Sequence, residues 1–133
     1  MKLVSVLTLA AIIPAFVAAQ DSRAQTTSDF GYATVALALE SMRAKVGVKI
    51  SVQSGWTVIE DPSTLSLWSF TPPGHSAHPA AAHRWIIREG DNLFVQSHIR
   101  CEGPKSACDA MAIEFGRLDE AMRESLKRKS PGR

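Results

Sequence analysis

Cysteine is scarce in this sequence of 133 residues, which contains only Cys101 and Cys108. Neither lies near the N-terminal apolar run, which excludes a lipoprotein anchored through a lipid on an N-terminal cysteine. Their spacing is wider than the C-x-x-C of thiol redox motifs, so the sequence does not indicate redox chemistry. We expect a structural disulfide between them, joining the end of a strand to the first turn of a helix.

An excess of charge of one sign is also lacking. The chain carries 15 Lys and Arg against 13 Asp and Glu, a formal net charge of +2. This near-neutrality argues against nucleic acid as a partner, because affinity for nucleic acid depends on neutralising phosphates. With 45% hydrophobic and 21% charged residues, the composition is that of a globular protein rather than a disordered one.

No apolar run reaches the length of about 20 residues that crosses a bilayer. A shorter run over 3–17 follows Lys2, and Val17-Ala18-Ala19 supplies small residues typical of a signal-peptidase site. We therefore predict a signal peptide over 1–19, cleaved near Ala19, and a flexible lead-in over 20–28. The mature protein is expected to be soluble in the periplasm or secreted. Both compartments are oxidising, which favours the disulfide.

Hydrophobic spacing predicts a helix at each end of the mature chain. The first, over about 29–45 with Thr27 or Ser28 as N-cap, carries an apolar stripe of Val35, Leu39, Met42 and Val46. The second, over about 105–127, is strongly amphipathic, with its apolar face at Cys108, Met111, Phe115, Leu118, Met122 and Leu126.

Alternating and apolar segments between the helices predict strands over 48–53, 56–60, 65–70, 84–88 and 93–101. The last two form a hairpin across Gly90-Asp91, and a proline-stiffened loop runs from Pro72 to Ala82. The sequence thus predicts a single α+β domain over 29–128, followed by a basic tail over 129–133. Its antiparallel sheet has about four to five strands, with both helices on one face. The opposite face, if apolar, would favour a homodimer.

All four histidines lie between residues 75 and 98, three of them in or next to this loop. His75, His78 and His83 could bind zinc or copper through neutral imidazole nitrogens. Their spacing matches no strong metal signature, however, and exposed loop histidines are the simpler interpretation. We therefore predict no cofactor, with a zinc or copper site as the alternative.

Large aromatic side chains are concentrated in the predicted strands, at Trp56, Trp68, Phe70 and Trp85. Such rings either form core or line a ligand groove on an uncovered sheet face. Core packing is the simpler interpretation for Trp68 and Phe70. As binding residues, the sequence offers Trp68, Phe70, His75, His78, His83 and Trp85.

No arrangement of residues indicates catalysis. Ser76 lies beside two histidines, but the G-x-S-x-G turn that often presents a nucleophilic serine is absent. Carboxylate pairs such as Glu60-Asp61 are adjacent in the chain and point in different directions. G-x-G-x-x-G and P-loop motifs are absent as well. We therefore predict no catalytic residue.

One segment carries a resemblance. Trp68-Ser69-Phe70-Thr71-Pro72, followed by His78-Pro79-Ala80, Arg84, Cys101 and Cys108-Asp109, resembles small exported bacterial proteins, chiefly of proteobacteria, to which no activity is attached. The resemblance covers about the C-terminal half of the mature chain. It implies a periplasmic setting and a shared core, and it carries over no ligand or catalytic residue.

The function predicted from these features is a non-enzymatic periplasmic or secreted binding module. Its contact surface would be the open sheet face and the loop of prolines and histidines, and its partner an envelope protein or a small ligand. The first alternative is a metal-binding protein that uses His75, His78 and His83. A small hydrolase is the third possibility.

Overall fold

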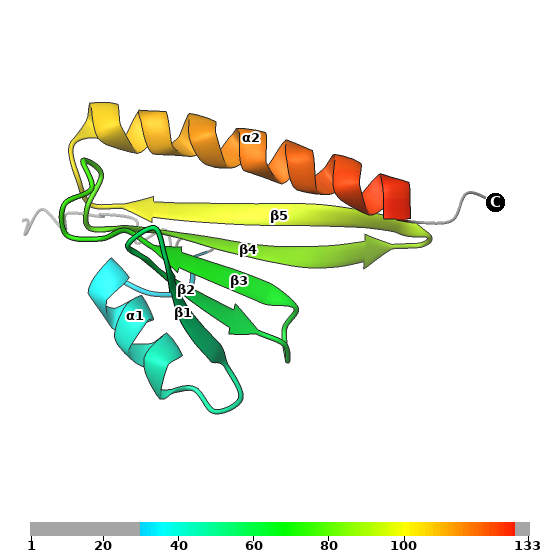
Figure 1. The fold of residues 1–133 in the computed structure, drawn as a ribbon, viewed down its shortest axis with the longest axis horizontal. Coiled ribbons are helices and arrows are strands. Elements are labelled where there is room, and N and C mark those ends of the chain that lie inside the picture. The colour runs from blue at the N-terminus through cyan, green and yellow to red at the C-terminus, as the bar shows by residue number, and fades with distance from the viewer. Residues whose placement is uncertain (1–29, 130–133) are drawn as a thin grey trace, which may run out of the picture.

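The computed structural model describes residues 30–129, so the predicted signal peptide, the lead-in and residues 130–133 lie outside the described residues. The fold is α+β, with five consecutive strands between a short helix and a long one (Figure 1). In chain order the elements are α1 (Val35–Ala44), β1 (Lys49–Gln53), β2 (Trp56–Asp61), β3 (Ser66–Phe70), β4 (Ala80–Glu89), β5 (Asn92–Cys101) and α2 (Lys105–Lys129).

The strands form one antiparallel sheet whose order, β1-β2-β3-β4-β5, follows the chain. Two tight turns set its register, because Gln53 pairs with Trp56 and Glu89 pairs with Asn92. The second turn is the predicted Gly90-Asp91 pair, and Gly90 has a φ of +61°. Positive φ values are what two-residue hairpin turns require, and glycine adopts them without strain.

β4 begins at Ala80 rather than at the predicted Arg84, so His83 lies in the sheet and not in the preceding loop. Alanine has little preference for strands, which explains why the sequence here resembles a loop. Burial overrides that preference. Ala80, Ala81 and Ala82 are all completely buried, between elements on both faces of the sheet.

α1 begins at Val35, later than predicted, because Gly31 has a φ of +83° that no right-handed helix contains. Thr34 is the N-cap, and its hydroxyl accepts a hydrogen bond of 3.1 Å from the Leu37 N–H. The Val35 N–H donates to the carboxylate of Glu102, at 3.1 Å. A residue just beyond β5 therefore holds the first turn of α1.

The two helices pack on opposite faces of the sheet, which corrects the prediction that both cover one face (Figure 1). On β4, Ala81 belongs to the cluster beneath α1, whereas Ala80 and Ala82 pack with Met111 and Phe115 of α2. Successive side chains of a strand point to opposite faces, so the helices must lie on opposite sides. Because β4 is apolar on both faces here, its sequence does not mark a single buried face.

The disulfide between Cys101 and Cys108 is confirmed, with the two Cα atoms 5.7 Å apart. It joins the end of β5 to the first turn of α2. Gly103 lies between them, and a Cβ at that position would come within 2.5 Å of the Ala77 carbonyl oxygen. The backbone of the 71–79 loop therefore packs directly on the connection that starts α2.

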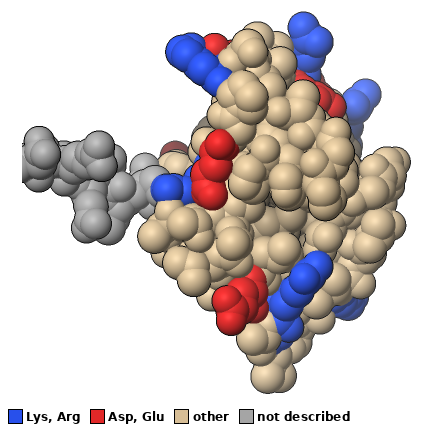
Figure 2. Space-filling view, turned by 90° about the vertical axis from the view of Figure 1, so that its left-hand side faces the viewer, with Lys and Arg blue, Asp and Glu red and all other residues tan. Residues whose placement is uncertain are grey.

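Figure 2 views the molecule from the end where this connection lies. The surface in this view is mainly uncharged, with Lys, Arg, Asp and Glu side chains of both signs scattered over it. That distribution is unlike the basic stripe expected of a nucleic-acid-binding surface.

Candidate ligand-binding groove

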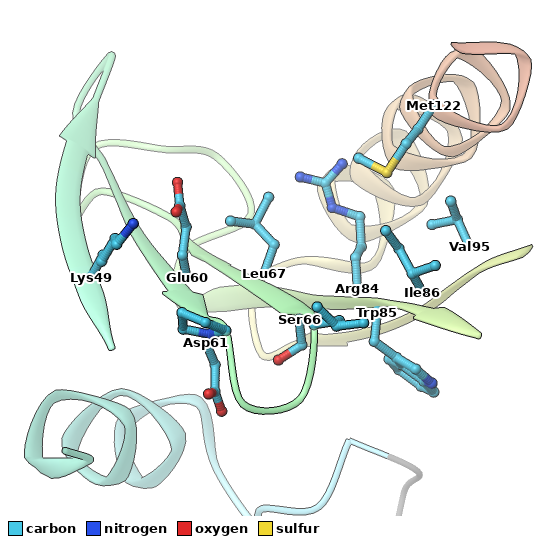
Figure 3. A pocket seen from close by; sticks show the side chains of 12 residues that line it. Lys49, Glu60, Asp61, Ser66, Leu67, Arg84, Trp85, Ile86, Val95 and Met122 are labelled. Atoms are coloured by element: carbon cyan, nitrogen blue, oxygen red, sulfur yellow. The ribbon is translucent and has the colours of Figure 1, made fainter. Parts of the chain in front are cut away.

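A groove of about 380 Å³ opens beside α2 on its face of the sheet (Figure 3). It forms because α2 runs along β5, which leaves β1 to β3 without a helix on this face. Half of the twelve residues that line it have non-aromatic apolar side chains, namely Pro62, Leu65, Leu67, Ile86, Val95 and Met122. Met122 reaches down from α2, while the sheet supplies the other walls (Figure 3).

Arg84 is the charged side chain at the helix side of the groove. Its side chain is 11% exposed, and its guanidinium carbon lies 5.2 Å from the centre of the Phe115 ring. The nearest carboxylate is Asp119 of α2, whose Oδ1 is 4.0 Å from Nη1 of Arg84. That distance permits an ion pair but is too long for a hydrogen bond.

Both partners of this ion pair keep unused hydrogen-bonding atoms. Among residues 30–129, neither Nε of Arg84 nor Oδ1 of Asp119 has a hydrogen-bond partner, although both atoms are buried. Burial lowers the pKa of the Arg84 guanidinium, and the attraction of Asp119 opposes this only in part. The positive charge is therefore incompletely compensated, although the guanidinium remains protonated at any physiological pH.

Lys49 and Glu60 line the side of the groove away from α2. They are register partners on β1 and β2, and their side chains rise on the same face (Figure 3). Asp61 and Trp85 also line the groove, but their side chains point away from it (Figure 3). Of the three charged side chains that face the groove, Arg84 has a buried donor, Nε, without a hydrogen-bond partner among the described residues.

The predicted binding residues Trp68 and Phe70 are core residues, 4% and 2% exposed. They pack beneath α1 with Phe30, and the Trp68 ring lies 5.3 Å from that of Phe30. Neither ring offers surface to an external ligand.

His83 and Trp85 belong to a stacked row of rings on the α1 face. His83 stacks on Trp68 at 3.9 Å, and Trp85 stacks on His83 and His98 at 4.7 and 5.0 Å. Burial, with a smaller contribution from the nearby His98, lowers the pKa of His83 to about 4. This aromatic row lies on the sheet face opposite the groove, and it continues from Trp68 of the core beneath α1.

His75 and His78 lie in the 71–79 loop and make local contacts. His75 accepts a hydrogen bond from the Ala77 N–H, and its ring meets Trp56 on the α2 side of the sheet. His78 is paired with Thr71 at 3.0 Å. The structure therefore does not bring the three predicted metal ligands together. Within residues 30–129, no group of three or more His, Cys, Asp or Glu is placed to hold a metal.

The groove residues Arg84 and Asp119 were not predicted as a site. The four-residue spacing of Asp119 and Arg123 is typical of an ion pair on the solvent face of a helix, but Asp119 is buried and Arg123 pairs with Glu120 instead. One signal was available, because Asp119 continues the four-residue spacing of Met111 and Phe115.

No protein family, curated protein or solved structure matches this chain. No helix among the described residues is long and apolar enough to cross a membrane.

Proposed function

We propose that this chain is a small exported binding module without enzymatic activity, and that the groove beside α2 is its ligand site. The observation that carries the proposal is the groove itself, a mainly apolar surface hollow of about 380 Å³. Pockets for small ligands typically measure about 300–1,000 Å³, with apolar walls and a few placed polar groups. The groove has this composition, with Arg84 as the charged group at its helix side.

The polar groups of the groove suit binding better than catalysis. Arg84 does not exchange protons at neutral pH, so it can hold a ligand but cannot serve as a general acid or base. Lys49 and Glu60 are cross-strand register partners of opposite charge.

Export remains part of the proposal, and two features support it. The leader-like residues 1–19 precede the domain, and the only two cysteines are joined in a disulfide. Disulfides persist in oxidising compartments such as the periplasm and the extracellular space.

The test uses N-phenylnaphthylamine, a neutral apolar dye whose fluorescence rises in apolar surroundings. We expect the purified protein to bind the dye at one site. Leu67→Trp should remove this binding because the larger ring fills the groove, whereas Leu37→Trp should not, since Leu37 is exposed on α1. Thermal melting reports whether each variant folds, and Met122→Trp replaces Leu67→Trp if the latter does not. Absence of dye binding, or binding that survives both groove substitutions, would contradict the proposal.

A further inference from the structure

We propose that the ligand of this groove is an aliphatic carboxylate, whose carboxylate is bound by Arg84 and whose chain lies along the aliphatic walls. This inference rests on the proposed binding function and adds the chemical class of the ligand. Three features of the groove support it: the unpartnered Nε donor of Arg84, the balance of charge, and the nature of the walls.

The first feature is the hydrogen-bonding capacity of Arg84. A guanidinium presents five N–H donors in a planar fork that matches a carboxylate, often through two parallel hydrogen bonds. Its nearest protein carboxylate, Asp119, stays at 4.0 Å and leaves its own Oδ1 without a hydrogen bond among the described residues. The fork is therefore held at the groove without being occupied by its ion-pair partner.

The second feature is the balance of charge. Burial lowers the pKa of Arg84 more than Asp119 raises it, so the protonated guanidinium is less stable here than in water. A second anion beside Arg84 would reduce this cost. At the other side, the register partners Lys49 and Glu60 carry opposite charges, so together they favour neither sign. A cationic ligand beside Arg84 would instead add a second positive charge next to the guanidinium.

The third feature is the lining between these charged groups. Leu67 and Ile86 rise from the sheet, and Met122 descends from α2 (Figure 3). These side chains offer dispersion and hydrophobic contact but no hydrogen bonds. A ligand that fits must be apolar along most of its length and anionic at one end, which describes an aliphatic carboxylate.

Asp119 is a positioning residue in this arrangement. It holds the Arg84 guanidinium on the helix side of the groove, above the Phe115 ring. Because Asp119→Asn removes the anion that partly compensates Arg84, we expect it to strengthen the preference for a carboxylate over a neutral head group while leaving the binding of the neutral dye unchanged. A merely structural role would change both together.

The experiment compares dodecanoate with dodecanol, which share a chain and differ in charge. Each displaces N-phenylnaphthylamine from the purified protein, at concentrations below those at which dodecanoate forms micelles. We expect dodecanoate to bind roughly tenfold more tightly than dodecanol, as a charge-assisted pair implies. Arg84→Met should abolish that preference and keep dodecanol binding, whereas the control Arg43→Gln, on the opposite face, should keep both. If Arg84→Met does not fold, Arg84→Lys retains the charge without the fork and should reduce the preference.

The outcomes separate this inference from the proposed function. If the dye binds in the groove but dodecanoate and dodecanol bind equally, or neither displaces the dye, the carboxylate assignment is wrong and the binding module stands. A preference for dodecanoate that survives substitution of Arg84 would also overturn the assignment. If the dye itself does not bind, the proposed function fails first.

Discussion

At the residue scale, Asp61 and Arg84 are both buried charged residues, but their charges are compensated differently. Asp61 accepts hydrogen bonds from Lys45 and from the backbone and hydroxyl of Ser63. These contacts hold the pKa of its carboxyl well below the usual range, with Lys45 the largest cause. Asp61 therefore stabilises the fold, whereas Nε of Arg84 has no hydrogen-bond partner among the described residues.

His83 makes stability depend on pH. Its pKa falls from 6.5 to about 4 on folding, chiefly through burial and secondarily through His98, while Asp61 acts weakly in the opposite direction. The unfolded chain thus binds a proton at higher pH than the folded chain does. Stability is complete above pH 6.5 and declines as the pH falls toward 4.

We expect the free energy of unfolding to fall by about 1 kcal/mol across this window, after discounting for the partial exposure of the ring. The control is His83→Phe, which keeps an aromatic ring in the row but cannot be protonated. Denaturant unfolding at neutral pH and at the middle of the window measures the effect. An equal decline in both proteins would show that His83 is not the titrating group.

At the element scale, local patterns predicted the elements that local forces determine. The amphipathic stripe gave the bounds of α2 closely, and Gly90-Asp91 located the last hairpin turn. The start of α1 was missed because it depends on the backbone of Gly31 and on Glu102, which is distant in sequence. The start of β4 was missed because burial between layers, not strand propensity, places Ala80 in the sheet.

The contact between Gly103 and Ala77 gives a prediction for the start of α2. In Gly103→Ala the new Cβ would lie 2.5 Å from the Ala77 carbonyl oxygen, so one backbone segment must move. We expect a loss of about 1–3 kcal/mol, the usual range for overpacking. Gly74→Ala is the matched control, since a Cβ there meets nothing within 4 Å. Equal stabilities for the two variants, measured by denaturant unfolding, would refute the close contact.

At the scale of the whole molecule, the groove follows from the placement of the two helices. α1 and α2 cover different parts of opposite faces, and the uncovered area beside α2 becomes the groove (Figure 1). The sequence patterns predict an open sheet surface, but they indicate that aromatic residues form its binding site. The position of the groove does not follow from local patterns, because Arg84 of β4 approaches Asp119 of α2 only when α2 packs on the sheet.

Locating the bound dye is the sharpest test of whether ligands bind in the groove beside α2. Backbone amide chemical shifts measured by NMR, with and without N-phenylnaphthylamine, report where the dye binds. We predict that the largest chemical-shift changes occur in the groove-lining segments 65–67 and 84–86 and around Met122. Changes centred instead on the 71–79 loop, or on His98 and the other rings of the aromatic row, would contradict it.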